Sequence, residues 1–294
     1  MEILARKPSN TIERTELWTV RPSSSEQVYR LTITRPLSPT DKPHGLLLTD
    51  GNHVVGTAAQ LTYFLELGQL APPTVVVTVG YPEDNSYPSI VARNRDLTPT
   101  SWPEWDASYG KVLGLDCPPS GHSKVFRRFL IDEVRPAVEA EAGVDPSEWT
   151  LGGHSLGGLF AVDSLFAAPG AFRRYFAVGS SFWWHKPLLF DRAEQFTADP
   201  TPRDISVYLA AGELESAVAL KREWEPHRDK TEWQEYLRIM GGFPDIVGDT
   251  FHMASILSGA ARVRAKAQIL PNETHGTAVF AALSQGIRWL NEPV

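Results

Sequence analysis

The chain has 294 residues, of which 42% are hydrophobic and 21% are charged, and its net charge is −7. This composition suits a large α/β domain with a substantial core, and the negative charge argues against non-specific binding to nucleic acid. The single cysteine, Cys117, excludes an internal disulfide. The chain has no apolar run of about 18 residues and no N-terminal stretch of signal-peptide type, so we expect a cytoplasmic protein without a membrane partner.

Short apolar and β-branched runs predict the strands. The first two runs, residues 16–20 and 27–34, predict an antiparallel hairpin. The later runs are continuously apolar, as expected for strands buried on both faces of a parallel sheet. They span residues 45–50, 74–80, 148–153, 174–180, 205–211 and 265–270.

Helical patterns lie between these strands, at residues 57–68, 123–143, 156–168 and 277–290. Strands that alternate with helices indicate a parallel sheet with helices on both faces, and we predict a single domain over residues 1–294. Two long segments, 81–121 and 213–262, depart from this alternation. Because such excursions at strand ends usually build substrate sites, we expect them to lie near the active site.

Residues 153–157, Gly-His-Ser-Leu-Gly, fit the pattern G-x-S-x-G. The pattern carries meaning only between a strand and a helix, where a sharp turn lifts the serine hydroxyl above the sheet. Here a predicted strand enters and a predicted helix leaves. Ser155 would then lie at a helix N-terminus, whose dipole favours a developing anion. The sequence therefore predicts a nucleophile at Ser155 rather than a serine in a glycine-rich packing turn.

The general base should come last along the chain, because the order in this arrangement is serine, acid, histidine. Among the eight histidines, His275 follows the last predicted strand and precedes the last helix. We expect it to take the Ser155 proton and return it to the leaving alcohol. A helix-capping surface histidine is the alternative.

The acid should follow the next-to-last strand, where residues 212–216 read Gly-Glu-Leu-Glu-Ser. We predict that Glu215 orients the imidazole and stabilises its cation, with Glu213 as the second choice and Asp249 as a distant third. The oxyanion hole requires two N–H donors. We expect them to be the backbone amides of Leu156, directly after the serine, and Asn52, in the loop after the strand at 45–50.

With these residues assembled, the chain resembles the putative-esterase family of the α/β-hydrolases. The pieces LLLTDGNHV (46–54), RNRDLTPT (93–100) and GSSFWWHK (179–186) resemble its siderophore-esterase branch. The resemblance implies an α/β-hydrolase fold with a mostly parallel sheet of about eight strands. It also implies carboxylic-ester hydrolysis with no metal and no cofactor. Feruloyl-type members carry Asp in the acid loop where this chain has Glu, and some relatives on the siderophore branch work with a Ser-His dyad.

Arginine and tryptophan side chains suggest the kind of ester. The guanidinium of Arg95 would bind a carboxylate or catecholate oxygen of the substrate. The alternative is a surface arginine paired with Asp96, and for Arg93 we prefer that alternative. Trp183 and Trp184 offer a flat surface for an aromatic acyl group, with one of the two expected in the core.

We therefore predict a serine hydrolase that cleaves bulky or aromatic esters, such as siderophore trilactones, through a Ser-His-Glu triad and an acyl-enzyme. Its partner would be a small-molecule ester. An acyltransferase on the same residues and a catalytically silent binding module are the alternatives.

Overall fold

The computed structural model describes residues 1–84 and 87–292. Within these ranges one sheet of nine strands has the order β1-β2-β3-β5-β4-β6-β7-β8-β9. The strands are β1 (Glu2–Pro8), β2 (Thr15–Arg21), β3 (Tyr29–Thr34), β4 (His44–Leu48), β5 (Thr74–Gly80), β6 (Trp149–His154), β7 (Arg174–Val178), β8 (Ile205–Gly212) and β9 (Val263–Leu270).

The sheet is parallel from β5 to β9, and β1, β2 and β3 extend it in antiparallel fashion beyond β5. All the predicted strands are present, and the predicted hairpin is the pair β2–β3. Strand β1 was not predicted. Every one of its seven residues is exposed, so it lacks the buried alternation by which a strand is recognised in sequence.

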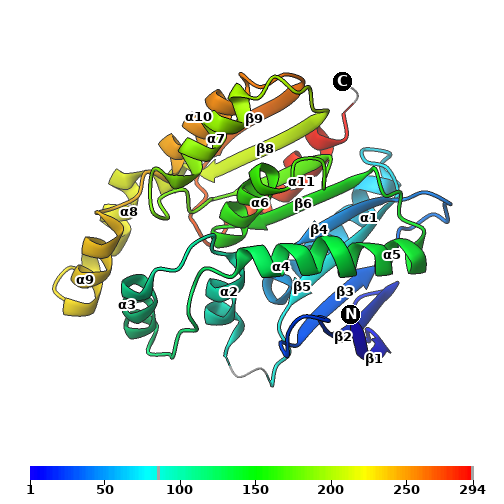
Figure 1. The fold of residues 1–294 in the computed structure, drawn as a ribbon, viewed down its shortest axis with the longest axis horizontal. Helices are drawn as coiled ribbons and strands as arrows, with labels where there is room; N and C mark the ends of the chain where they lie inside the picture. The colour runs from blue at the N-terminus through cyan, green and yellow to red at the C-terminus, as the bar shows by residue number, and fades with distance from the viewer. Residues whose placement is uncertain (85–86, 293–294) are drawn as a thin grey trace.

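Helices cover both faces of the sheet (Figure 1). Helices α1 and α11 pack on one face around Leu48 and Phe176, whereas α4 to α7 and α10 pack on the other face around Leu47 and Tyr175. The helices are α1 (Gly51–Leu67), α2 (Ser89–Leu97), α3 (Pro103–Leu113), α4 (Ser123–Phe129), α5 (Arg135–Ala142), α6 (Leu156–Ala167), α7 (Leu188–Ala198), α8 (Ala217–Trp224), α9 (Thr231–Met240), α10 (Ile246–Leu257) and α11 (Ala278–Leu290). In the described part of the chain, no helix is both long and apolar enough to span a bilayer; the cytoplasmic location stays a prediction.

The helix predicted over 123–143 is interrupted. A π-helical turn, Leu130–Val134, separates α4 from α5. Pro136 lies in the first turn of α5, and it has no N–H to donate to the carbonyl four residues earlier. The wider turn before it is a common way for a helix to accommodate such a change in hydrogen bonding.

The two long excursions meet beyond one end of the sheet. The segment 81–121 contains α2 and α3, and the segment 213–262 contains α8, α9 and α10. Trp105 of α3 contacts Tyr236 of α9, with ring centroids 4.8 Å apart. In Figure 1, α3, α8 and α9 project together past the strand ends. They are therefore placed to border a site at that edge.

Gly286 lets α11 lie close to the sheet, since a Cβ there would be 2.5 Å from the Phe176 ring. Gly286→Ala should lower the free energy of unfolding by about 1–3 kcal/mol, because the clash forces the helix outward. Gly56 of α1 is the matched control, as a Cβ there meets nothing within 4 Å. Gly56→Ala should stabilise by up to about 1 kcal/mol. Urea unfolding measures both, and a Gly286→Ala variant as stable as wild type would contradict the packing argument.

Candidate active site

Ser155 lies at the turn between β6 and α6 with φ 60° and ψ −117°. A positive φ is strained for a residue that carries a Cβ, so neighbouring contacts have to hold it. The Ser155 N–H donates to the Val178 carbonyl at 2.9 Å. The Ser155 carbonyl accepts from the Ser181 N–H at 3.1 Å. These bonds fix the turn to the end of β7 and to the loop that follows.

The two glycines of the motif are required by close packing. A Cβ on Gly153 would be 2.5 Å from the backbone carbon of Gly157 and would also overlap the Thr49 hydroxyl. A Cβ on Gly157 would overlap the same hydroxyl. Both positions are therefore restricted to glycine by the end of β4, and the strand-turn-helix context expected for G-x-S-x-G is present.

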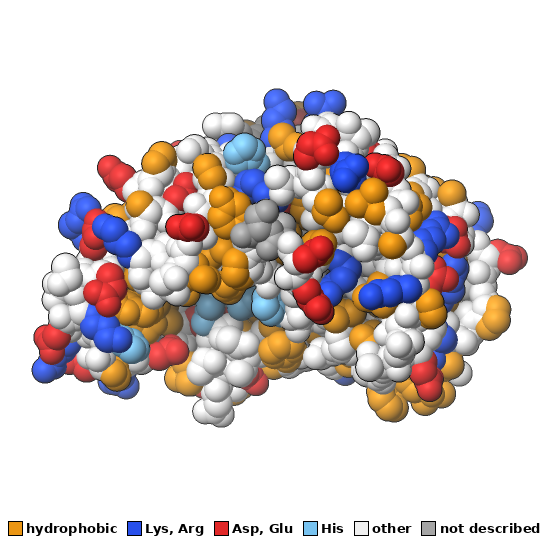
Figure 2. Space-filling view, turned by 90° about the horizontal axis from the view of Figure 1, so that it is seen from below, with side chains coloured by type: hydrophobic (Ala, Val, Ile, Leu, Met, Phe, Trp, Pro, Cys, Tyr) orange, Lys and Arg blue, Asp and Glu red, His pale blue; other side chains and the backbone are white. Residues whose placement is uncertain are grey.

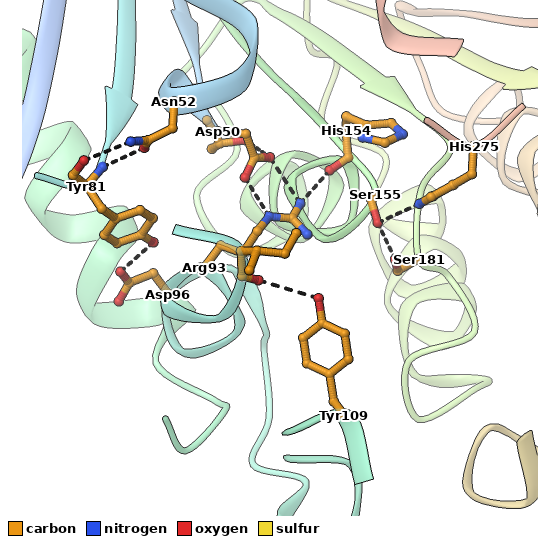
Figure 3. Close-up of polar contacts among 12 residues, drawn as sticks. Asp50, Asn52, Tyr81, Arg93, Asp96, Tyr109, His154, Ser155, Ser181 and His275 are labelled. Atoms are coloured by element: carbon orange, nitrogen blue, oxygen red, sulfur yellow. Dashed lines mark hydrogen bonds and ion pairs between the residues drawn. The ribbon is translucent and has the colours of Figure 1, made fainter. Parts of the chain in front are cut away.

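Three side chains form a continuous hydrogen-bonded chain at this turn. His275 Nε2 lies 3.0 Å from Ser155 Oγ, and His275 Nδ1 lies 2.5 Å from Glu215 Oε1. Figure 3 shows His275 directed at the Ser155 hydroxyl, with Ser181 below it. Glu215 is fully buried, whereas the His275 side chain is 37% exposed. The arrangement has the geometry of a nucleophile, a base and an orienting carboxylate.

The two glutamates in the loop after β8 make different contacts. Glu215 Oε2 accepts from the Gly212 N–H at 2.5 Å, which leaves Oε1 for His275. Glu213 points to the neighbouring loop, where its Oε2 accepts from the Asn272 N–H at 2.9 Å. Asp249 lies in α10 and accepts from Lys186 Nζ at 2.6 Å. Of the three carboxylates weighed from sequence, Glu215 is the one that contacts the imidazole.

His154 packs beside the base, with its ring centroid 4.6 Å from that of His275. Burial, followed by the neighbouring His275 and Arg93 charges, lowers the pKa of His154 well below its usual value. The ring is therefore neutral at neutral pH. It fills space behind His275 without adding a positive charge there.

A buried ion pair ties the site to the end of β4. Arg93 Nε donates to Asp50 Oδ1 at 2.5 Å, and Arg93 Nη2 donates to Asp50 Oδ2 at 3.0 Å. The same Nη2 also donates to the carbonyl of His154 at 2.9 Å (Figure 3). Arg93 thus joins the turn after β4 to the turn that carries Ser155.

A cavity of about 590 Å³ opens above Ser155. Both excursions contribute to its lining, the second with Leu220 and Glu223 among its residues, and His53 of α1 lies beside them. Figure 2 shows histidine side chains beside hydrophobic ones near the middle of the face seen from below. We call the tryptophan and tyrosine side chains of the lining the aromatic wall; its members are Trp105, Tyr109, Trp183, Trp224 and Tyr236.

The tryptophan pair divides as expected, with one residue at the cavity and one in the core. Trp183 lines the cavity and packs against Trp105 with ring centroids 4.7 Å apart. Trp184 is fully buried, and its Nε1 donates to Thr100 Oγ1 at 3.0 Å. Trp183 is therefore the member of the pair that a ligand can contact.

Arg95 does not lie at the cavity. Its Nε and Nη2 each donate to Asp96 at 2.8 Å, and its Nη1 donates to Gln27 at 2.6 Å. The expected roles of the two arginines are exchanged, because Arg93 lines the cavity and Arg95 pairs with Asp96. They are two residues apart on α2, so they face different sides of the helix.

The side chain of Asn52 is directed at Tyr81, whereas the prediction concerned its backbone amide. Its Oδ1 accepts from the Tyr81 N–H at 2.7 Å, and its Nδ2 donates to the Tyr81 carbonyl at 2.8 Å (Figure 3). Asp50 and His53 line the cavity from this turn instead. Sequence reasoning gave neither residue a place in the lining, although both lie within the piece LLLTDGNHV (46–54).

The architecture is an α/β-hydrolase fold, and comparison with solved structures confirms this predicted class. The chain superposes on the BES protein from Bacillus cereus with a TM-score of 0.75 at 22% identity, covering 99% of this chain and 100% of that one. It superposes on the siderophore hydrolase EstB from Aspergillus nidulans with a TM-score of 0.76 at 23% identity, covering 98% and 99%.

Sequence comparison identifies the family. Residues 26–242 match the family described as "Putative esterase". The chain is 31% identical over 217 residues to the ferri-bacillibactin esterase BesA of Bacillus subtilis, covering 70% of this chain and 72% of the relative. It is 27% identical over 281 residues to a siderophore enterobactin esterase of Emericella nidulans, covering 90% and 89%. The chain therefore belongs to the putative esterase family and is a carboxylic-ester hydrolase, and its resemblance to the siderophore-esterase branch is confirmed.

Proposed function

We propose that this esterase works through a Ser155-His275-Glu215 triad on siderophore-type esters with aromatic acyl groups. The proposal rests on the unbroken hydrogen-bonded chain from Glu215 through His275 to Ser155, at 2.5 Å and 3.0 Å, which ends in the aromatic-lined cavity. A buried carboxylate, an imidazole and a hydroxyl in this order are the arrangement by which hydrolases activate a serine.

The reaction follows from the two imidazole contacts. With Nδ1 protonated and donating to Glu215, Nε2 of His275 accepts the Ser155 proton while Oγ attacks the ester carbonyl. The Glu215 carboxylate stabilises the imidazolium. The imidazolium then protonates the departing alcohol, which leaves an acyl group on Ser155. A water molecule, deprotonated by the same Nε2, releases the acid and restores the serine.

The developing oxyanion requires two N–H donors near Ser155. The amide of Leu156 opens α6 directly after the serine, as expected from sequence. The second donor is an amide of the turn after β4, either that of Asn52, as expected from sequence, or that of Asp50, which lines the cavity. Neither the Leu156 nor the Asp50 amide donates to an acceptor among the described residues.

The aromatic wall and the relatives support the substrate class. The cavity volume lies within the range typical of sites for small organic ligands. Flat apolar rings favour aromatic acyl groups over short aliphatic ones. Two relatives are named as a ferri-bacillibactin esterase and a siderophore enterobactin esterase. A catecholate trilactone is therefore the substrate to test first.

Removing the nucleophile tests the proposed mechanism. Ser155→Ala should lower kcat/KM on an activated aryl ester by at least about a thousandfold and leave the melting temperature nearly unchanged. Ser181→Ala is the control, because its Oγ is 3.4 Å from the Ser155 hydroxyl and contacts no imidazole nitrogen. That variant should stay within about tenfold of wild type. A Ser155→Ala enzyme with activity near wild type would remove Ser155 from the mechanism.

Glu215 and Glu213 provide a matched pair of variants that tests which carboxylate orients His275. Glu215→Gln should reduce turnover at least about a hundredfold, because the imidazolium loses its charged partner. Glu213→Gln should cost less than about tenfold, since the Glu213 side chain accepts from the Asn272 N–H and does not contact the imidazole. Steady-state kinetics on one ester decide between them. A reversed order would assign the role to Glu213, and two small effects would indicate a dyad.

Trp183 tests the aromatic preference. Trp183→Ala should lower kcat/KM for an aromatic ester by up to about tenfold and spare a matched acetate, because the stacking surface is lost. Trp233→Ala is the control: Trp233 contacts Trp224 at 4.9 Å but does not line the cavity. It should affect both esters equally or not at all. Equal losses on both esters in Trp183→Ala would count against the proposed substrate class.

A further inference from the structure

A small hollow lies beside the cavity, between α8, the 3-10 turn Glu225–His227 and α9. Its volume is about 150 Å³, and an apolar cavity of about that size holds one benzene ring. Among the described residues, Trp224 is the one that lines both the hollow and the cavity above Ser155. In Figure 1, α8 and α9 lie at one end of the molecule, away from the sheet. A ligand in the hollow would therefore lie outside the cavity but next to the aromatic wall.

Aromatic rings from three segments line the hollow. Trp224 ends α8, Trp233 lies in α9 and Phe243 follows α9. The Trp224 ring meets the rings of Trp233 and Phe243 with centroids 4.9 Å and 5.6 Å apart, at angles of 76° and 70°. Rings set nearly at right angles form a corner, in which a further ring can stack on one and meet another edge-on. The hollow is thus suited to a flat aromatic ring.

The charged side chains of the hollow favour an anion. Lys221, Glu225 and Arg228 line it, and Arg228 is paired with Glu225 at 2.6 Å. Lys221 is exposed and forms no ion pair within the described part of the chain. The lining therefore keeps one uncompensated positive charge, in a protein whose net charge is −7. An ammonium beside an aromatic corner matches a ring that carries a carboxylate.

We propose that this hollow binds an aromatic carboxylate with a single ring. The ring stacks in the corner formed by Trp224, Trp233 and Phe243, and the carboxylate accepts from Lys221 Nζ. Hydrolysis of an ester with an aromatic acyl group releases an acid of this class. The binding site goes beyond the proposed function, and only the identity of its ligand as a reaction product rests on that function.

The cavity itself is less suited to such an acid. Among its described lining residues the one lysine or arginine is Arg93, which pairs with Asp50 at 2.5 Å. Glu223 also lines the cavity and forms no ion pair with another described residue. It is two positions from Lys221 on α8, and residues two apart face different sides of a helix. The acid would therefore meet a repelling carboxylate in the cavity and a free ammonium in the hollow.

Two ligands with the same ring test the role of charge. They are para-fluorobenzoate and para-fluorobenzyl alcohol, and fluorine NMR titration gives the Kd of each. Wild type should bind the benzoate with a Kd of about 1 mM or tighter and the alcohol at least about fivefold more weakly. Lys221→Gln should weaken binding of the benzoate about fivefold and leave that of the alcohol unchanged, because only the benzoate uses the ammonium.

Two further variants separate this contact from other causes. Lys230→Gln is the matched control, because Lys230 lies in the same excursion, is exposed and does not line the hollow. It should leave both Kd values within about twofold of wild type. Trp233→Leu should weaken both ligands at least about fivefold, because a stacking surface is lost. A melting temperature near that of wild type shows that α8 and α9 stay in place in each variant.

The cavity can be tested separately from the hollow. A phenyl phosphonofluoridate phosphonylates an activated serine with loss of fluoride, and on Ser155 it would place a ring in the cavity. The modified enzyme should bind para-fluorobenzoate as the unmodified enzyme does. Trp183→Ala removes a ring that lines the cavity and not the hollow, so it should also leave this Kd unchanged.

The outcomes are distinct. Loss of binding in the phosphonylated enzyme or in Trp183→Ala would place the acid in the cavity and overturn the inference. Equal binding of the benzoate and the alcohol would overturn it too, as would a Lys221→Gln variant that binds the benzoate like wild type, or no binding at all. The titrations use no ester, so each of these results leaves the proposed function intact. An enzyme that binds the acid but cleaves no aryl ester would overturn the proposed function alone.

Discussion

The buried ion pair between Arg93 and Asp50 is the contact on which the geometry around Ser155 depends. Removing two charges from water is costly, and only a well-oriented pair with further hydrogen bonds offsets that cost. Here the guanidinium binds both carboxylate oxygens and the carbonyl before Ser155. The pair therefore joins the turns after β4 and β6, where glycines bring the backbones together. A strained serine between a strand and a helix persists because these contacts fix it from several sides.

Chemistry and selectivity come from different parts of the chain. Strands β6, β8 and β9 carry Ser155, Glu215 and His275 respectively, each on a short loop after the strand. The excursions 81–121 and 213–262 supply most of the aromatic wall and also Glu223. These excursions contact each other through aromatic rings of α3 and α9. Changes in α8 or α9 can therefore alter which ester fits while the reacting groups stay where they are.

The sequence was informative where a pattern or an order along the chain decides the structure, and uninformative where side-chain direction decides it. Apolar runs predicted eight of the nine strands, and chain order paired Ser155 with His275, which lie 3.0 Å apart. Side-chain direction separates near neighbours: Arg93 from Arg95, Trp183 from Trp184, and Glu213 from Glu215. In each pair the residues are of the same type and share a loop or helix, and a shift of one or two positions decides which one reaches the cavity or, for the glutamates, the imidazole. That choice is set by tertiary packing, which no local pattern records.

The position of β9 has a consequence for how this enzyme loses activity on heating. His275 follows β9, which is the last strand of the sheet, and most of its residues are only half-buried. Edge elements open at lower free energy than the interior of a sheet. The imidazole is thus carried by a part of the fold that frays early, while the turn at Ser155 sits between buried central strands. Thermal inactivation should accordingly begin as a local and reversible detachment of the base, at temperatures where the rest of the sheet is still intact.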